Sequence, residues 1–240
     1  ARAGMTLRAA QKNETIQSLP AEWADFRGTS YDASGTRGGS AGSNNAVVSI
    51  QTPIDADAST LYWSNALGNG TGSRSAGCPL LVDGVLIVYA GDTLYRIDPV
   101  SGEILTQAKM DHASSFSITP PTYAKGMVFV GLSDGTIQAF DAKTLQSLWI
   151  YHDPLEGQPN SPITICGDYL YTGFWRSEEF PANFVCLSIT DEDPTRTDEE
   201  KTACWYWTNP GGYYWAGAYA CEDYVLVGTD DGADESTSMT

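Results

Sequence analysis

Short apolar runs separated by glycine and aspartate turns fill the middle of the chain. Between residues 120 and 151, apolar runs alternate with turns at Gly126 and at Asp134, and the last run contains Trp149. Runs of four to seven residues joined by tight turns are typical of β-strands rather than helices. The pattern predicts a meander of four antiparallel strands.

The same meander recurs along the chain. When the segment that begins at Cys78 is aligned with the segment 120–151, Gly84 falls on Gly126, a spacing of 126 − 84 = 42 residues. A third, longer copy begins near residue 161, and a fourth begins near residue 215. Four strands in a repeat of roughly 40 to 50 residues indicate a β-propeller blade. The second run of each repeat is continuously apolar, as expected for a strand covered on both faces.

The sequence therefore predicts an all-β protein, a β-propeller of four-stranded antiparallel blades with about half of a seven- or eight-bladed ring present. The expected units are an N-terminal tail 1–20 and a partial propeller 21–240, made of a lead-in and preceding blade 21–77, blades 78–119, 120–160 and 161–214, and a partial blade 215–240. We expect these residues to be part of a longer chain. A half-ring closed by dimerisation and a β-sandwich are the alternatives.

The repeat at 120–151 resembles the pyrroloquinoline-quinone-type, or quinoprotein-like, propeller repeat. The resemblance rests on its glycine turn, its Asp-Gly turn, its Ala-x-Asp sequence and its final tryptophan, carried by Gly126, Asp134, Gly135, Asp141 and Trp149. The whole chain also resembles uncharacterised secreted or cell-surface proteins of Gram-positive gut bacteria. The resemblance implies a fold and no particular activity, because the repeat occurs in quinoprotein dehydrogenases, in an outer-membrane assembly lipoprotein and elsewhere.

Residues 22–38 resemble the lead-in that often precedes such propellers. The match is carried by Trp23, Phe26, Arg27 and Gly28. Together with the repeats, the similarity covers nearly the whole chain.

The charge of the chain limits its partners. The formal net charge is −17, from 13 basic and 30 acidic residues. Such a surface repels phosphate backbones, so we expect no nucleic-acid binding. There is no apolar stretch of 18 residues, so we expect no direct membrane insertion. These properties suit a secreted or cell-surface, extracellular protein.

The cysteines and histidines give no metal motif. The five cysteines form no C-x-x-C pair, and His112 and His152 are the only histidines. We therefore expect no metal site. Cys186 and Cys204 fall on neighbouring predicted strands, so a cross-strand disulfide is sterically possible, and the sequence leaves it open. The acidic run 190–201 lacks the spacing of a calcium loop and is predicted to be a solvated loop.

A binding site is expected on one face of the propeller. Within a four-stranded blade, the turns between strands two and three lie on the same face as the links to the next blade. The predicted ligand-binding residues on this face are Phe116, Asn160, Trp175, Arg176, Tyr214 and Trp215. Aromatic rings beside polar groups suit a glycan or a peptide. The alternative is that these rings pack in the seams between blades.

The sequence shows no recognisable catalytic set. It has no G-x-S-x-G motif, and no two of its cysteines are adjacent. We therefore expect a non-catalytic propeller that acts as a protein- or glycan-binding scaffold without a cofactor. The alternative is a pyrroloquinoline-quinone-dependent dehydrogenase domain, because the repeat also occurs in quinoprotein dehydrogenases.

Overall fold

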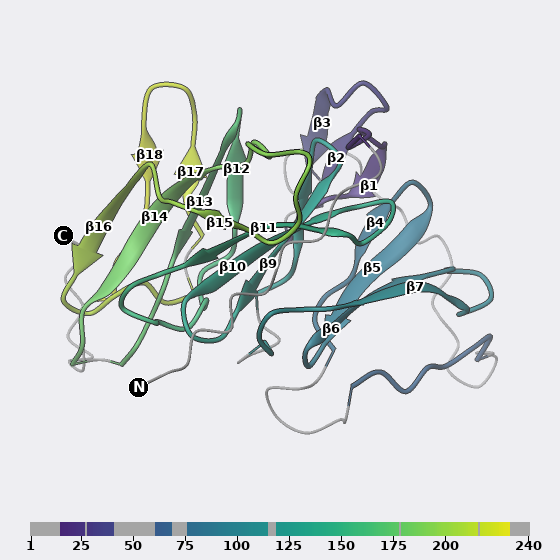
Figure 1. Ribbon diagram of the computed structural model, residues 1–240, viewed down its shortest axis with the longest axis horizontal. Coiled ribbons are helices and arrows are strands. Elements are labelled where there is room, and N and C mark those ends of the chain that lie inside the picture. Colours follow the sequence, from purple (N-terminus) through teal and green to yellow (C-terminus); the bar gives the residue numbers. More distant parts are fainter. Residues whose placement is uncertain are drawn as a thin grey trace, which may run out of the picture.

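The regular elements of the described residues are all β-strands, as the computed structural model in Figure 1 shows. The structure describes residues 15–26, 28–40, 61–68, 76–114, 119–177, 179–215 and 217–230. Over these ranges there is no helix that could cross a membrane. The prediction of an all-β fold is confirmed.

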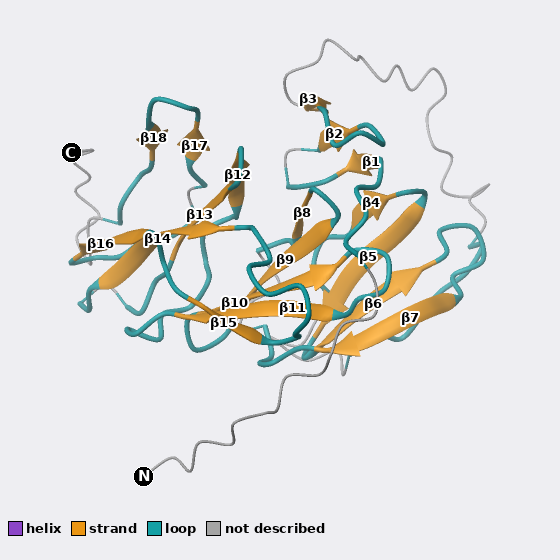
Figure 2. Cartoon of the chain, turned by 45° about the horizontal axis from the view of Figure 1, so that its top comes forward, coloured by secondary structure: helices purple, strands orange, loops and turns teal. Residues whose placement is uncertain are grey.

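Three consecutive meanders form the body of the molecule. The first consists of β4 (Leu80–Val82), β5 (Val85–Ala90), β6 (Thr93–Ile97) and β7 (Ile104–Lys109). The second consists of β8 (Thr122–Ala124), β9 (Met127–Leu132), β10 (Thr136–Asp141) and β11 (Ser147–His152). The third consists of β12 (Thr164–Cys166), β13 (Tyr169–Gly173), β14 (Ala182–Ser188) and β16 (Trp205–Asn209). Each pairs antiparallel in meander order, and the three sheets lie side by side in Figures 1 and 2, as the blades of a partial propeller do.

The middle meander is apolar on both faces because it packs against both neighbours. Every residue of β9 and β10 is buried. Along β9, Val128 and Val130 enter the core shared with the first meander, whereas Met127 and Phe129 enter the core shared with the third. Successive side chains of a strand point to opposite faces, so a strand between two cores is apolar at every position.

The lead-in joins the sheet of the first meander. Its strands β1 (Ala21–Trp23), β2 (Thr29–Tyr31) and β3 (Arg37–Ser40) extend that sheet to seven strands, in the order β3-β2-β1-β4-β5-β6-β7. The Tyr123 N–H donates to the Ala24 carbonyl at 2.6 Å, which also ties the lead-in to the second meander. The pairing of β1 with β4 was not anticipated. The limits of the individual units remain predictions.

The acidic run is only partly a solvated loop. Its end forms β15 (Glu199–Lys201), which pairs in parallel with β11 and so extends the second meander to five strands. The Lys201 side chain is 2% exposed, and its Nζ donates to the Thr190 carbonyl at 2.5 Å and to Glu192 at 3.2 Å. The same Nζ lies 5.1 Å from the centre of the Trp149 ring. The expectation of a solvated loop is wrong for this strand, because backbone pairing and Lys201 hold it on the neighbouring blade.

The tryptophans of the last strands differ in burial. Trp149 on β11 is fully buried, and its ring centre lies 5.7 Å from that of Phe129. Trp205 and Trp207 occupy the last strand of the third meander, β16, but they are 43% and 72% exposed. The next strands, β17 (Tyr219–Ala220) and β18 (Val225–Leu226), form a separate two-stranded sheet whose first strand contacts β12.

All five cysteines are free thiols in the structure. Cys186 is buried in β14, and the Cys204 N–H donates to its carbonyl at 2.8 Å. Burial, followed by the neighbouring Cys204 thiol, raises the pKa of Cys186 to about 11. The Cys186 thiol is therefore uncharged and unreactive at neutral pH.

Candidate ligand-binding site

Two links and a turn meet at one end of the third meander. The link 153–163 leads from β11 to β12, the turn 174–181 joins β13 to β14, and the link 210–218 follows β16. Gln158 and Trp175 exchange backbone hydrogen bonds at 2.6 and 2.9 Å, and the Tyr213 N–H donates to the Phe174 carbonyl at 2.9 Å. These bonds fix the three segments against one another.

Three of the predicted aromatic residues come together on this scaffold. The ring centres of Trp175 and Tyr214 lie 4.9 Å apart, and those of Tyr214 and Trp215 lie 4.7 Å apart. Trp175 and Tyr214 are half-buried, whereas Trp215 is 58% exposed. Trp215 has a φ of 61°, a conformation that costs a bulky residue about 1–3 kcal/mol. The scaffold thus holds an exposed indole in a strained backbone position, a feature that clusters at functional sites.

Buried polar atoms without partners lie in the link 153–163 and in the Trp175 ring itself. Asn160 is 2% exposed, and neither its amide nitrogen nor its amide oxygen has a hydrogen-bond partner in the described part of the chain. The same holds for Gln158 Oε1 and Trp175 Nε1. A buried polar group without a partner costs about 1–3 kcal/mol. Four such atoms in one link and the turn paired with it indicate a place that a ligand or water must complete.

The other predicted residues lie differently. Arg176 is exposed, and its guanidinium carbon lies 5.4 Å from the centre of the Phe180 ring, so it packs on its own turn. Phe116 lies outside the described residues. Tyr213, the neighbour of Tyr214, is 2% exposed and packs against Phe184 with ring centres 5.3 Å apart. Tyr213 therefore packs in the seam, as the alternative interpretation of these rings predicts. The ligand-binding role of the six predicted residues remains a prediction.

Sequence reasoning missed one side-chain cluster. His112 and His152, 40 residues apart in the sequence, both lie within hydrogen-bond distance of one carboxylate oxygen of Asp111, at 2.6 and 3.2 Å. Burial of Asp111 is outweighed by the hydrogen bond from His152, which holds the pKa of that carboxyl below its ordinary value. No linear motif joins these residues, since only the packing of the first meander on the second brings them together.

A quinone-dependent dehydrogenase would hold its quinone together with calcium, and the described residues do not fit that group. Such a quinone stacks on a tryptophan and, in many of these enzymes, lies under a disulfide between adjacent cysteines. Here the Trp175 ring packs against Tyr214, with ring centres 4.9 Å apart, and no two cysteines are adjacent. The group of potential metal ligands in the described chain is Asp111, His112 and His152. Calcium prefers six to eight oxygen ligands, so two imidazoles do not suit it.

Comparison with known proteins assigns the class. Residues 47–179 match the model of a family described as outer membrane protein assembly factor BamB, a family of quinoprotein-like repeats. The fold and this match together define a PQQ-type β-propeller repeat protein. Because the match spans more than half of the chain, the chain belongs to that family.

Several dehydrogenases share part of this similarity. The chain is 31% identical over 103 residues to quinoprotein ethanol dehydrogenase from Pseudomonas aeruginosa, covering 43% of this chain and 16% of the relative. The quinohemoprotein alcohol dehydrogenase of Pseudomonas putida is similar in structure, with 17% identity, a TM-score of 0.47, and coverage of 59% of this chain and 22% of that one. The computationally designed Ika4 protein has 14% identity and a TM-score of 0.47, covering 70% and 92%. The chain thus spans less than a quarter of either dehydrogenase.

Proposed function

We propose that this protein is a non-catalytic, secreted or cell-surface binding module whose propeller face holds a protein or glycan ligand at Trp175, Tyr214 and Trp215. Of the two ligand classes, the site suits a glycan better. Exposed aromatic rings stack on the apolar faces of sugars, and the strained backbone at Trp215 keeps such a ring on the surface. The acidic surface, with a net charge of −17, suits an uncharged ligand better than an anionic one.

The buried Asn160 amide is the observation that carries the proposal. An amide offers two N–H donors and one carbonyl acceptor, and both sides of this one lack partners among the residues that the structure describes. Neighbouring sugar hydroxyls can donate and accept at the same time, so they would satisfy both sides once the link 153–163 opened to admit them, because Asn160 is only 2% exposed in the free chain. An apolar peptide side chain would leave the Asn160 amide unpaired.

The test compares glycan and peptide binding of the whole chain on arrays, followed by titration calorimetry of any hit. Trp215→Ala is expected to weaken binding by about tenfold or more, as for a central aromatic contact. Trp23→Ala is the matched control, because Trp23 is a similarly exposed indole on β1. Equal affinities of the two variants would contradict the proposed site. A peptide hit that depends on Trp215 would keep the site and replace the ligand class.

A second variant tests whether the Asn160 amide serves ligand binding or the stability of the fold. Asn160→Leu keeps the side-chain volume but removes the unpaired polar atoms, so we expect higher stability and lost glycan binding. Lower stability with binding unchanged would show that the amide serves the fold instead.

The alternative of a quinone-dependent dehydrogenase domain rests on the 31% identity to the ethanol dehydrogenase. Dye-linked alcohol oxidation by the chain, after incubation with pyrroloquinoline quinone and calcium, would support it. We expect no turnover above that of the cofactor alone, because the described residues do not fit the group.

A further inference from the structure

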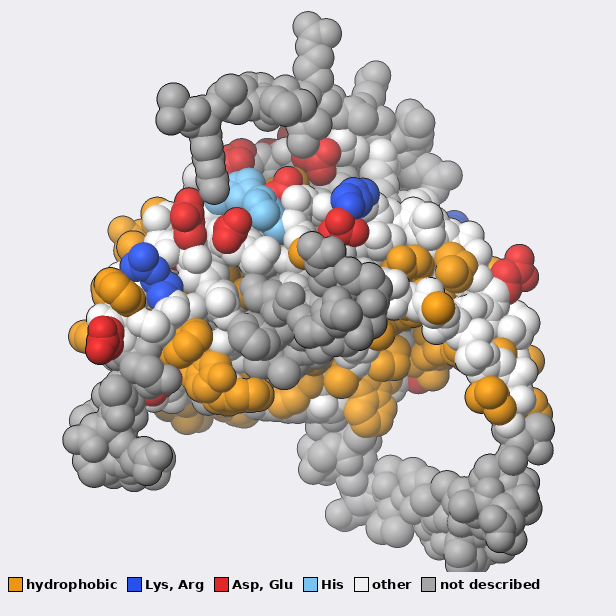
Figure 3. All heavy atoms as spheres, turned by 90° about the horizontal axis from the view of Figure 1, so that it is seen from below, with side chains coloured by type: hydrophobic (Ala, Val, Ile, Leu, Met, Phe, Trp, Pro, Cys, Tyr) orange, Lys and Arg blue, Asp and Glu red, His pale blue; other side chains and the backbone are white. Residues whose placement is uncertain are grey.

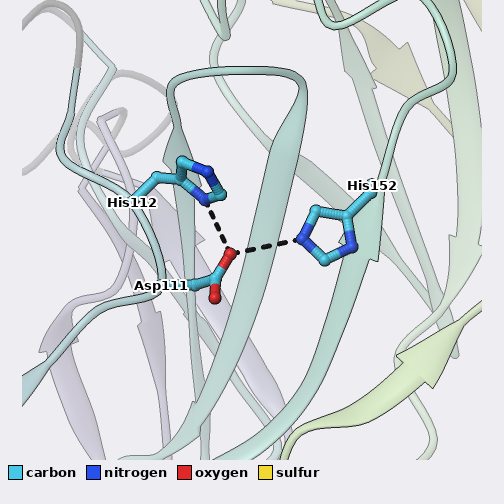
Figure 4. A group of neighbouring side chains, drawn as sticks. All are labelled: Asp111, His112 and His152. Atoms are coloured by element: carbon cyan, nitrogen blue, oxygen red, sulfur yellow. Dashed lines mark hydrogen bonds and ion pairs between the residues drawn. The ribbon is translucent and has the colours of Figure 1, made fainter. Parts of the chain in front are cut away.

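We propose that Asp111, His112 and His152 form a binding site for a divalent transition-metal ion of the zinc type. Asp111 and His112 begin the link that follows β7, and His152 is the last residue of β11. The only two histidines of the chain thus meet across the boundary between the first and second meanders (Figure 4).

The backbone around the cluster is fixed. The Asp111 N–H donates to Gln138 Oε1 on β10 at 2.8 Å. The Ala113 carbonyl accepts from the Ser133 N–H at 2.9 Å and from the Ser133 hydroxyl at 2.7 Å. These bonds hold the link against the second meander on both sides of His112. Both histidines therefore sit on a supported framework and not on a free loop.

The ligand atoms lie close enough together to share one metal ion after a small adjustment. Asp111 Oδ2 lies 2.6 Å from His112 Nδ1 and 3.2 Å from His152 Nε2, and one ligand atom of each residue lies within 4.8 Å of the others. An ion about 2.0–2.2 Å from each ligand sets neighbouring ligand atoms about 3–3.5 Å apart. The Asp111–His152 pair already meets this spacing, and a small rotation of the His112 ring brings the other pair to it.

The outer nitrogens of both rings face further carboxylates. His152 Nδ1 lies 3.4 Å from Glu200 Oε1, and His112 Nε2 lies 3.7 Å from Asp134 Oδ2. Imidazoles that bind metal ions characteristically have a carboxylate or carbonyl on the nitrogen that does not bind, which fixes the tautomer and the ring orientation. The contacts with Glu200 and Asp134 are independent of those with Asp111. They support metal binding through His112 Nδ1 and His152 Nε2, the two nitrogens that face Asp111.

The site is open to solvent and lies in a negative field. The side chains of Asp111, His112 and His152 are 20%, 33% and 41% exposed. Figure 3 shows the histidines together on the surface with acidic side chains around them. This field attracts cations. Two imidazoles and one carboxylate select zinc-type ions over calcium and magnesium, which prefer oxygen ligands.

The test titrates ZnCl2 into the full chain after removal of bound metal with a chelator, using calorimetry and the imidazole signals in NMR spectra. One equivalent of Zn²⁺ is expected to bind and to shift the signals of both histidines. His112→Ala and His152→Ala should each weaken binding by more than tenfold, and Glu200→Gln by about tenfold. Asp223→Asn is the control, since it removes the same charge from an exposed position elsewhere.

Two outcomes would overturn the proposal. The first is no saturable Zn²⁺ binding by a chain whose circular dichroism shows the folded state. The second is Zn²⁺ binding that is unaffected in His152→Ala, which would place the ion elsewhere. Because both histidines are partly exposed, their alanine variants are expected to fold, and Co²⁺ absorption spectra provide a further readout of nitrogen ligation in the wild-type chain.

Discussion

At the scale of single residues, corresponding turns of two blades use different amino acids for the same backbone shape. Gly102 and Leu145 both occupy the left-handed region, with φ of 76° and 59°. A side chain on Gly102 would collide with the Trp63 ring, 2.6 Å away, whereas Leu145 is 2% exposed in the core shared with the first meander. Packing thus outweighs backbone strain at Leu145.

This comparison predicts the effect of Leu145→Gly. The substitution relieves about 1 kcal/mol of strain but removes a buried side chain worth about 2–5 kcal/mol, so the free energy of unfolding should fall by about 1–4 kcal/mol. Urea denaturation measures the change. A variant as stable as the wild type would show that the leucine packs poorly.

The aspartate of the same turn makes stability depend on pH. Backbone N–H groups of Ser101 and then Val100 donate to Asp98, and they hold the pKa of its carboxyl below the ordinary value. A carboxyl whose pKa is lower in the folded state stabilises the fold above its unfolded pKa, and this contribution is lost as the pH falls through the folded value. Asp98→Asn keeps a side-chain acceptor but cannot titrate.

We therefore expect the free energy of unfolding of the wild type to fall more steeply below about pH 4 than that of Asp98→Asn. Urea denaturation at a series of pH values measures both slopes. The NMR titration of the Asp98 carboxyl carbon gives the folded pKa directly. Parallel slopes in the two proteins would contradict the assignment of this effect to Asp98.

At the scale of elements, strand β15 depends on one buried cation. Lys201 is bonded to the Thr190 carbonyl and Glu192, and its Nζ lies over the Trp149 ring. Lys201→Met preserves the apolar stem but leaves the carbonyl without its donor, which costs about 1–3 kcal/mol. We expect faster amide hydrogen exchange in β11 and β15. Lys143→Met, at an exposed lysine, should leave exchange unchanged, and unaltered exchange in both variants would contradict this role for Lys201.

The meanders could be predicted from the sequence because their strands are neighbours in the chain. Tight turns at Gly84 and Gly126 place each strand beside the next one in the chain. The continuously apolar run 127–130 indicates a strand that is covered on both faces. The pairings of β1 with β4 and of β11 with β15 left no such trace. They consist of backbone hydrogen bonds between distant strands, and the side chains of β15, Glu-Glu-Lys, have the composition of a loop.

The candidate sites were also predictable only in part, because contacts between distant segments leave no pattern in the sequence. The aromatic residues could be assigned to one face because strand direction alone places loops. The unpaired Asn160 amide and the packing of Arg176 on Phe180 depend on side-chain positions that no spacing encodes. The cluster of His112, His152 and Asp111 arises from two links of different blades, so each histidine is isolated in the sequence.

At the scale of the whole molecule, the two ends of the row of blades expose apolar surface. Propeller blades are stabilised by stacking their flat faces, and the middle meander is covered on both sides. The third meander instead exposes Trp205 and Trp207 on β16. At the other end, an apolar hollow of about 450 Å³ is lined by residues that include Trp23, Phe26 and Leu81.

Exposed apolar patches of this kind promote association. The chain is therefore expected to self-associate at high concentration, with a sedimentation coefficient that rises with the loading concentration. Trp205→Ser combined with Trp207→Ser should reduce this rise, because β16 is an edge strand and these side chains are 43% and 72% exposed. Trp215→Ser, on the propeller face, is the control and should not change it. If the double variant associates as strongly as the wild type, the face of β16 is not the contact surface, and the hollow at Trp23 becomes the next surface to substitute.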